Sequence, residues 1–573
     1  MKNRFILLLY TLLASLSSCT NAVQADTHEP RIFEYASIYI PGSETAEATS
    51  LGLNSIDSDW GLWGHNLSSV LPAKPSQTIY AKQNGSADRS QFCFSSNQLY
   101  EYIESYIIDH YGERKRNRFA ILPNDNDHVC TCPECTAAGN TKQDASPALF
   151  RLISRLAERF PNHLFFTSYY RTTRSLPAQP LPENTGVLIS TMDYPLSTAA
   201  TPDEQRFMEQ LRRWTAATSH VYVWDYINNF DDYFTPFPVF GVMQRRFEQY
   251  AAAGVKGIFL NGSGTDYSSL SRLRLHLLAA QLADPQLDWR SELPALCRKL
   301  YPVTGETIAA FLLRQEDFVA RKGVALPLYE GITKEVATYL PEEEFTAFYH
   351  ALQELRPQTS RAERQETDRL CGALALTALE LKRLHGDTSG TEPLLAELEQ
   401  LLSQKIEIYN EACWTIEAYL RDYRYMLKHA AELGERDLLR GAKLNSLSPL
   451  DPDYRDLSIL TDGVLGLPSN YHSGHVLSSE PTFQIAFRHV PGMRHLRVWL
   501  TRNLAYRIAL PLRVLLTANG KSVGVMEPQK SAEHPGHAFV EFDLPASAEG
   551  TLVLTLVRDP DTRTMAVSEI EAY

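Results

Sequence analysis

The sequence predicts a multidomain α/β protein with a (β/α) barrel of the TIM type, a helical bundle and a C-terminal antiparallel β-sandwich. Three observations support this fold class. Apolar strand-like runs alternate with amphipathic helical runs over the first half of the 573 residues. Long helical stretches with few Gly or Pro come next, and short alternating strands separated by turn residues close the chain. A chain of this length suits two or three domains.

The chain starts with a basic and apolar leader that ends in a cysteine. Lys2 and Arg4 precede an apolar run, 5–13, that is too short to anchor the chain across a bilayer. The string LSSC at 16–19 resembles the lipobox of bacterial lipoproteins, whose cleavage would leave Cys19 as the lipidated first residue. An ordinary secretory signal, cleaved nearby in AVQA, is the alternative. We therefore expect a signal peptide over 1–19 and a lipid-anchored protein of the cell envelope, at the periplasmic face or the outer-membrane surface.

Composition excludes one class of partner. The formal net charge is −13, and no long basic run is present, which argues against nucleic acid. The hydrophobic fraction of 44% is that of a folded protein with a large core. Apart from the leader, no stretch of the sequence is long and apolar enough to be a transmembrane helix, so the lipid would be the membrane attachment.

The barrel is expected over 30–289, because strand and helix patterns alternate there. Alternation of this kind indicates a parallel sheet covered by helices. In such barrels the active site is built at the carboxyl ends of the strands, where this sequence places polar or acidic residues. A doubly wound sheet is the alternative, but no Gly-rich phosphate-binding string follows any strand. The expected strands are FEYASIYI (33–40), RFAILPND (118–125), HLFFTSYY (163–170), GVLISTMDY (186–194), HVYVWDY (220–226) and KGIFLNG (256–262).

Two further domains are expected after the barrel. Residues 290–445 keep a helical apolar stripe and predict a helical bundle packed against the barrel. Residues 451–573 contain strings such as LRVWLTR and GTLVLTLVRD, and short strands at this spacing predict a β-sandwich.

The string CTCPEC at 130–135 places three cysteines in six positions. Cys93 is the natural fourth partner of Cys130, Cys132 and Cys135. Four thiolates could hold a structural zinc ion, whereas two disulfides among the same four suit an oxidising exported compartment equally well. In both cases the group would fix the loop that carries Asp125. The other cysteines at 297, 371 and 413 lie in helical patterns and are expected to be buried small hydrophobes.

Carboxylates at strand ends are the candidate catalytic groups. Asp225 follows Trp224 and precedes Tyr226, and a carboxylate between aromatic walls is partly desolvated, which suits a general acid. Asp125 could supply the second carboxylate that glycoside hydrolysis needs, with Asp193 as a third candidate. The structural alternative for each is an Asp that caps a turn.

Aromatic and amide side chains are the candidate substrate contacts. The loop 58–72 brings flat rings, an imidazole and an amide together, as a sugar-binding wall would, although a structural aromatic turn explains the pattern equally well. The expected substrate-binding residues are Trp63, His65, Asn66, Tyr170, Trp224, Tyr226, Asn229 and Asn261.

Several strings together resemble the domain-of-unknown-function family 4838. They are DWGLWGHNLSSVLP, QFCFSSNQLYEYI, ILPNDNDHVCTCPECTAAG, VYVWDYINNFDDYFTPFPVF and GVKGIFLNGSG, in that order. This family occurs in bacterial lipoproteins and is placed among glycoside-hydrolase TIM barrels near the alpha-glucuronidases. The resemblance, over about residues 50 to 290, therefore implies a glycan-directed barrel. LTDGVLG (460–466) and MAVSEIEAY (565–573) are similar to the start and end of a discoidin-like, galactose-binding sandwich, which implies carbohydrate binding.

The sequence thus predicts an exported glycoside hydrolase that acts on a complex glycan through paired carboxylates. Its partners would be the glycan and, through the lipid, the membrane. No cofactor is expected for catalysis. The alternative is a non-catalytic glycan-binding lipoprotein on a degenerate barrel. Two carboxylates about 5–10 Å apart across a concave pocket would favour hydrolysis.

Overall fold

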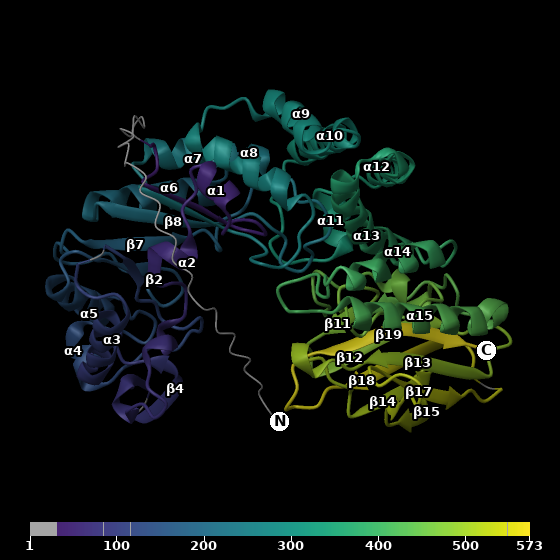
Figure 1. Ribbon diagram of the computed structural model, residues 1–573. Coiled ribbons are helices and arrows are strands. Elements are labelled where there is room, and N and C mark those ends of the chain that lie inside the picture. Colours follow the sequence, from purple (N-terminus) through teal and green to yellow (C-terminus); the bar gives the residue numbers. More distant parts are fainter. Residues whose placement is uncertain (1–30, 84, 115, 547) are drawn as a thin grey trace, which may run out of the picture.

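The structure is a computed structural model that describes residues 31–573 except 84, 115 and 547. The predicted lipidation site, Cys19, lies outside the described residues. Figure 1 shows a strand-and-helix part formed by the first half of the chain, a group of helices beside it, and a yellow-green sandwich at the C-terminal end. The fold is therefore mixed α/β.

A seven-stranded parallel sheet forms the centre of the first part. Its strand order is β1-β9-β8-β7-β6-β5-β2. From β5 to β9, each strand pairs in parallel with the strand that follows it in the chain, as alternating strands and helices require. The strands are β1 (Tyr35–Tyr39), β2 (Trp60–Leu62), β5 (Arg118–Ala120), β6 (Leu164–Tyr169), β7 (Thr185–Ser190), β8 (His220–Tyr226) and β9 (Gly257–Asn261).

The sheet is a partial barrel, and the closed TIM barrel that we predicted is not formed by strand pairing. Within the described residues β1 and β2 are the two free edges, since no ladder joins them. Their side chains nevertheless meet, because the rings of Tyr35 in β1 and Trp60 in β2 pack edge to face at 5.8 Å. Aromatic packing therefore joins the two edges where a hydrogen-bonded ladder would close a full barrel.

All six predicted strands are present, and the seventh, β2, was missed. It lies in the string that we interpreted as a loop, where Gly61 leaves room for the ring of Phe119; a Cβ on Gly61 would approach that ring to 2.2 Å. A hairpin of β3 (Tyr80–Gln83) and β4 (Ser86–Phe92) follows β2 and was also missed.

Period-two alternation along the strands separates two faces of the sheet. The inner face carries an aromatic cluster that contains Tyr35, Trp60, Phe166 and Tyr222. The outer face carries apolar residues such as Val221 and Val223, which belong to the core beneath the helices. The inner cluster fills the sheet's concave side, so a ligand can enter only near the strand ends.

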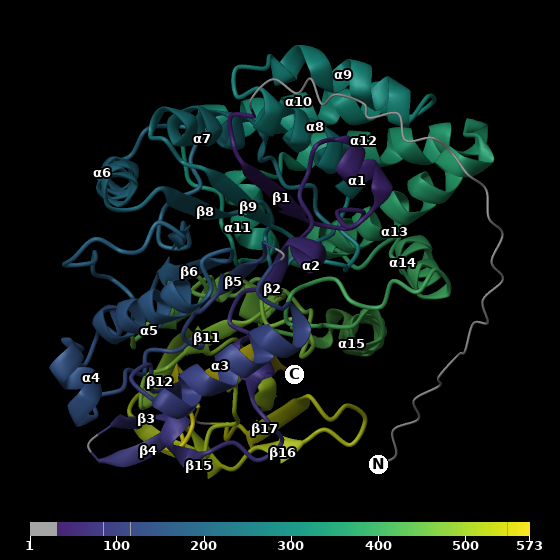
Figure 2. The same cartoon turned by 60° about the vertical axis from the view of Figure 1, so that its left-hand side comes forward.

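Helices cover the outer face of the sheet. Figure 2 shows α7 and α8 beside β8 and β9. Helix α6 starts with a capping box, in which Thr201 and Glu204 bond each other's backbone N–H groups. The covering helices are α3 (Asn97–His110), α5 (Ser146–Arg159), α6 (Pro202–Ala217), α7 (Phe240–Ala252) and α8 (Ser271–Ala283). The short helices α1 (Ala46–Ser50) and α2 (Ile56–Asp59) precede α3, and α4 (Pro133–Ala138) precedes α5.

The helical part shares one hydrophobic core with the sheet part. Phe237, next to the sheet, packs edge to face on Tyr339 of the helical part, with ring centroids 5.3 Å apart. Cys297 and Cys371 are buried, as expected, but Cys413 is exposed in the turn before α15, so that prediction was wrong. The helices are α9 (Trp289–Leu300), α10 (Gly305–Lys322), α11 (Ile332–Thr338), α12 (Glu342–Leu355), α13 (Arg361–Leu384), α14 (Glu392–Ser403) and α15 (Ile416–Leu433).

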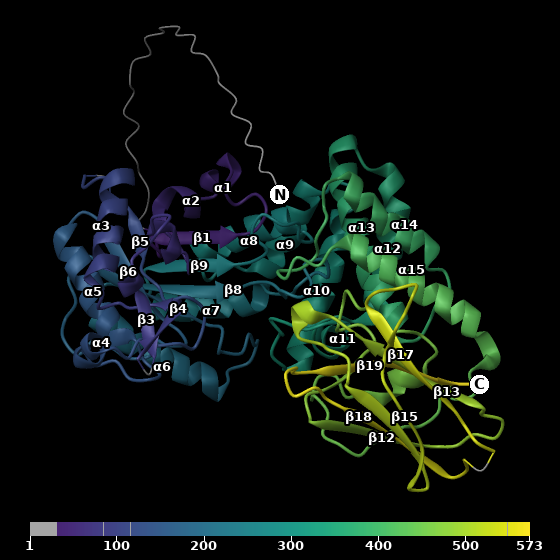
Figure 3. The ribbon, with the colours of Figure 1, turned by 90° about the horizontal axis from the view of Figure 1, so that it is seen from below.

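The C-terminal part is an antiparallel β-sandwich of two five-stranded sheets, ordered β10-β12-β18-β14-β15 and β11-β19-β13-β17-β16. Figure 3 shows the sandwich beside α15. A separate apolar core fills it. The strands are β10 (Asn445–Ser446), β11 (Val476–Ser478), β12 (Thr482–Arg488), β13 (His495–Thr501), β14 (Arg513–Ala518), β15 (Lys521–Met526), β16 (Gln529–Lys530), β17 (His537–Asp543), β18 (Thr551–Val557) and β19 (Met565–Ala572). Across the described part of the chain, no helix has the length and apolarity to cross a bilayer.

Candidate functional site

A cavity of about 160 Å³ opens at the carboxyl ends of the parallel strands. Inner-face residues of β6 to β9 form its floor, and two residues of the helical part complete its wall. It is smaller than the roughly 300–1,000 Å³ typical of pockets for drug-sized ligands, so it suits one small unit such as a sugar ring. The lining residues are His65, Leu122, Asp125, Ser168, Tyr170, Leu188, Ser190, Met192, Trp224, Tyr226, Asn261, Tyr329 and Glu411.

The structure brings six of the eleven predicted catalytic and binding residues to this cavity and leaves five outside its lining. Those that line it are His65, Asp125, Tyr170, Trp224, Tyr226 and Asn261. Those that do not are Trp63, Asn66, Asp193, Asp225 and Asn229.

Asp225 lies on the opposite face of β8 from the cavity, so its predicted catalytic role requires correction. Its carboxylate is fully buried and forms an ion pair with Arg246 of α7. Tyr250 donates to it at 2.6 Å and Thr191 at 2.7 Å. Burial opposes the charged form of Arg246, but the Asp225 charge raises the pKa of that guanidinium. A carboxylate held this way attaches α7 to the sheet and has no path to a substrate.

Two other predicted polar residues also have structural or surface positions. The Asp193 carboxylate is half exposed and pairs with Arg174 at 2.7 Å, outside the cavity lining. Asn229 is fully buried, and its amide nitrogen donates at 2.8 Å to both Glu335 Oε1 and the Glu330 carbonyl. Asn229 therefore fastens the strand-end loop to the helical part.

The predicted loop residues Trp63 and Asn66 also miss the cavity. Trp63 stacks on Trp224 with ring centroids 5.0 Å apart and supports the floor from beneath. Asn66 is exposed at the start of a short 3-10 turn. Of this loop, His65 alone of the three predicted residues reaches the cavity.

Asp125 is the carboxylate that the loop after β5 supplies to the cavity. Its side chain is 52% exposed, and Arg171 Nε lies 3.1 Å from Oδ1. Arg171 also donates to the Tyr170 hydroxyl at 3.2 Å and adopts a left-handed backbone, with φ of 45°, which a non-glycine residue rarely adopts. The turn thus places the Arg171 guanidinium beside Asp125.

Glu411 is the second carboxylate of the cavity, and sequence reasoning missed it. It lies in the connection between α14 and α15, and its Oε2 accepts a hydrogen bond from the Tyr329 hydroxyl at 2.7 Å. Glu411 is exposed on one side. Partial desolvation raises its pKa, the Tyr329 hydrogen bond opposes this shift, and the charges of Asp231 and Asp125 add to it. A raised pKa is what a general acid requires.

Glu411 is held in place through the backbone. Its N–H donates to the Phe230 carbonyl at 2.9 Å, and Phe230 stacks on Tyr329 at 5.4 Å. No pattern in the sequence marks Glu411 or Tyr329, because both stand between helices far from the strands whose ends they face.

Polar groups on the cavity floor are fixed by hydrogen bonds. His65 Nδ1 lies 2.6 Å from the Pro123 carbonyl, which can only accept, so Nδ1 donates and Nε2 is left to contact a ligand. The Tyr226 hydroxyl lies 3.0 Å from Ser190 Oγ, and burial raises the pKa of Tyr226. Both the Tyr226 phenol and the His65 imidazole can therefore orient a polar ligand.

The four cysteines predicted to cluster are together. The Sγ atoms of Cys93, Cys130, Cys132 and Cys135 lie within 4.8 Å of one another, and all four residues are buried. The cluster could hold a metal ion. It lies outside the cavity lining.

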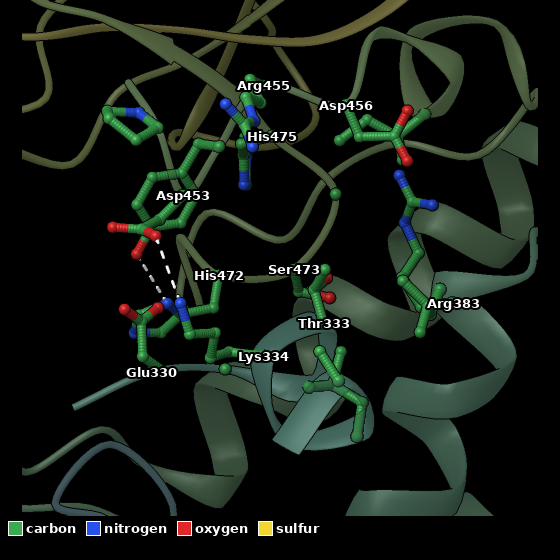
Figure 4. Close-up of a pocket in the computed structure, with 18 residues that line it drawn as sticks. Glu330, Thr333, Lys334, Arg383, Asp453, Arg455, Asp456, His472, Ser473 and His475 are labelled. Atoms are coloured by element: carbon green, nitrogen blue, oxygen red, sulfur yellow. Dashed lines mark hydrogen bonds and ion pairs between the residues drawn. The ribbon is translucent and has the colours of Figure 1, made fainter. Parts of the chain in front are cut away.

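A second, larger cavity of about 390 Å³ lies between the helical part and the sandwich. Figure 4 shows Lys334 pointing toward Asp453, and the two form an ion pair at 3.7 Å. Two more lining residues are paired, His472 with Asp231 at 3.0 Å and Arg383 with Asp462 at 2.8 Å, although Asp231 and Asp462 are not part of the lining. These pairs join the two parts, so we assign the chemistry to the smaller cavity at the strand ends.

Comparison with protein families confirms the predicted resemblance. Residues 65–312 match the family described as "Domain of unknown function (DUF4838)". This segment contains β5 to β9 and the cavity residues that they carry, whereas Tyr329 and Glu411 lie beyond it. No curated protein sequence matches the chain.

Solved structures similar to this chain are glycoside hydrolases and carbohydrate-binding modules. A GH115 4-O-methyl-alpha-glucuronidase with specificity for decorated arabinogalactans matches at 11% identity and a TM-score of 0.34, over 83% of this chain and 66% of that chain. A GH138 enzyme targeting pectin rhamnogalacturonan II matches at 9% identity and a TM-score of 0.31, over 83% of this chain and 76% of that chain. The CBM32-2 module bound to GalNAc matches at 14% identity and a TM-score of 0.18, over 23% of this chain and 97% of that chain. The chain thus spans just under two thirds of the glucuronidase.

Proposed function

We propose that this protein is a glycoside hydrolase whose general acid is Glu411 and whose base or nucleophile is Asp125. The observation that carries the proposal is that these two carboxylates line one cavity in different electrostatic surroundings. Desolvation raises the pKa of Glu411, whereas Asp125 faces the guanidinium of Arg171. Glycosidases use two carboxyl groups in separate roles, one as general acid and the other as base or nucleophile.

The remaining lining suits a sugar ring. The rings of Tyr170, Trp224 and Tyr226 offer apolar faces, on which the C–H face of a sugar can stack. Asn261 and His65 Nε2 supply directed polar contacts for hydroxyl groups. In the proposed reaction Glu411 protonates the leaving oxygen, while Asp125 attacks the anomeric carbon or activates a water molecule.

The test compares two carboxamide variants. On a panel of polysaccharides and aryl glycosides, Asp125→Asn and Glu411→Gln should each lower turnover by about two to four orders of magnitude, the usual worth of acid–base catalysis. Glu407→Gln, which changes an exposed glutamate four residues earlier, is the matched control and should keep full activity. Wild-type turnover in both carboxamide variants would refute the assignment.

The second candidate is a protein that binds a glycan without cleaving it. The Arg171–Asp125 ion pair favours it, because a carboxylate engaged by arginine is a weaker nucleophile. If the parent protein binds members of the panel and releases no product from any, this function replaces hydrolysis.

The location and the cysteine cluster complete the proposal. The leader at 1–19 supports export and lipid attachment at Cys19, with the folded parts in the cell envelope. The cluster would act as a structural metal site, most simply for zinc, since it stands outside the cavity where the chemistry would occur.

A further inference from the structure

The geometry of the four-cysteine cluster discriminates between a metal ion and disulfides. Cys93 Sγ lies 3.7 Å from Cys132 Sγ and 3.6 Å from Cys135 Sγ. A disulfide requires about 2.05 Å between sulfur atoms. Four sulfurs at the corners of a tetrahedron around zinc, each about 2.3 Å from the ion, are about 3.8 Å apart. These two spacings agree with the second arrangement, and the four Sγ atoms all lie within 4.8 Å of one another.

Backbone N–H groups already point at two of the sulfurs. The Lys82 N–H donates to Cys130 Sγ at 3.2 Å, and the Cys135 N–H donates to Cys132 Sγ at 3.4 Å. Such bonds stabilise negative charge on sulfur, and thiolates are the form that binds metal. A tetrahedral set of four sulfurs is selective for zinc or iron among the common biological metals.

The cluster joins two segments that flank the proposed catalytic loop. Cys93 follows strand β4, whereas Cys130, Cys132 and Cys135 follow the loop that begins after β5. Direct hydrogen bonds also join these two segments, at the residues on either side of Asp125. Asn124 Nδ2 and Asn126 Nδ2 both donate to the Ser90 carbonyl, at 2.8 and 2.9 Å.

A buried glutamine completes this connection. The Gln91 side chain is 1% exposed. Its Oε1 accepts the Asn124 N–H at 3.0 Å, and its Nε2 donates to the Asn124 carbonyl at 3.0 Å. The residues on both sides of Asp125 are therefore held by β4, and β4 is held to the end of the same loop by the cysteines.

We propose that Cys93, Cys130, Cys132 and Cys135 bind one Zn²⁺ ion as four thiolates and that this ion positions the Asp125 loop. The ion replaces the four thiol protons and is neither oxidised nor reduced. Metal binding stands independently of the proposed hydrolysis, whereas the consequence for Asp125 rests on that proposed function.

The first experiment measures metal content in the full chain as isolated, without added metal. Elemental analysis should find one zinc ion per chain in the wild type and in Cys413→Ser, which removes an exposed thiol outside the cluster. Cys132→Ser should lose most of the zinc. Iron in place of zinc would contradict the choice of metal, and two disulfides detected by thiol counting under denaturing conditions would overturn the site.

The second experiment covers the case in which Cys132→Ser fails to fold. The wild-type chain is stripped with a chelator and then titrated with Co²⁺ alone. Saturation at one equivalent with the thiolate-to-cobalt absorption of a tetrahedral four-sulfur site supports the proposal, and no cobalt binding by the folded chain overturns it.

Hydrogen exchange tests the positioning role. The exchange rate at 120–132 should rise on chelation while that of the sandwich is unchanged; equal protection in both states would refute the positioning role. Asp125→Asn should keep its zinc, so that loss of activity and loss of metal remain distinguishable.

Discussion

Trp224 and Asp225 are neighbours in β8, yet their side chains lie on opposite faces of the sheet. Trp224 lines the cavity, whereas Asp225 is buried beneath α7 in an ion pair with Arg246. Alternation along a strand imposes this separation, since successive side chains point to opposite faces. An aromatic–acidic string at a strand end can therefore place only one of its two members in a site.

Replacement of Asp225 should affect stability before activity. Asp225→Asn leaves the buried Arg246 guanidinium without its counter-charge, a change that typically costs about 3–5 kcal/mol. Chemical denaturation should report a loss of this size. Asp193→Asn, which breaks an exposed pair with Arg174, is the control and should cost no more than about 1 kcal/mol. A variant at 225 with wild-type stability and no turnover would restore the catalytic interpretation.

The pH profile should respond to Tyr329. Desolvation raises the pKa of Glu411. The Tyr329 hydroxyl donates a hydrogen bond to this carboxyl group and thereby partly opposes the rise. Tyr329→Phe removes this hydrogen bond, so the pKa of Glu411 should rise further. Because a general acid must be protonated, activity falls as pH rises through its pKa, and the basic limb of kcat/KM should move to higher pH. A limb that stays in place, or moves to lower pH, would argue against Glu411 as the acid.

Glu316 should make the stability of the protein depend on pH. Burial raises the pKa of this α10 carboxyl group to about 7, although it accepts hydrogen bonds from the Phe240 and Gly241 N–H groups at the start of α7. The folded state then holds a proton that the unfolded state releases near pH 4.3. Between these values, rising pH should lower the unfolding free energy by at most about 1.4 kcal/mol per pH unit.

The variant Glu316→Gln tests whether Glu316 causes this pH dependence of the unfolding free energy. The glutamine keeps an acceptor for the helix N–H groups but cannot ionise, so denaturation at several pH values should show a flatter profile than the wild type. The stability difference should favour the variant increasingly as pH rises toward 7. Parallel profiles in the two proteins would contradict the prediction.

The predicted membrane attachment depends on a lipid at Cys19. Cys19→Ala removes the lipid acceptor, so the exported chain should leave the membrane fraction and appear in soluble form. Fractionation and detection of the chain in each fraction provide the measurement. Persistent membrane association of the variant would count against a lipid anchor.

The sequence by itself determined the local elements and their order. Apolar alternation predicted six strands of the sheet, and CTCPEC with Cys93 predicted the cysteine cluster, because both patterns depend on spacing along the chain. The same reasoning missed β2, since three residues with Gly at the centre give no period to detect.

The tertiary structure alone decided which carboxylates share the cavity. Asp125 was accessible to sequence reasoning because it follows a strand, but Glu411 reaches the cavity from a connection between helices, far from the sheet in sequence. Only long-range contacts, such as the hydrogen bond from the Glu411 N–H to the Phe230 carbonyl, bring that connection to the strand ends. Open edges at β1 and β2 have the same origin, because strand pairing across a barrel seam depends on contacts that no local pattern encodes.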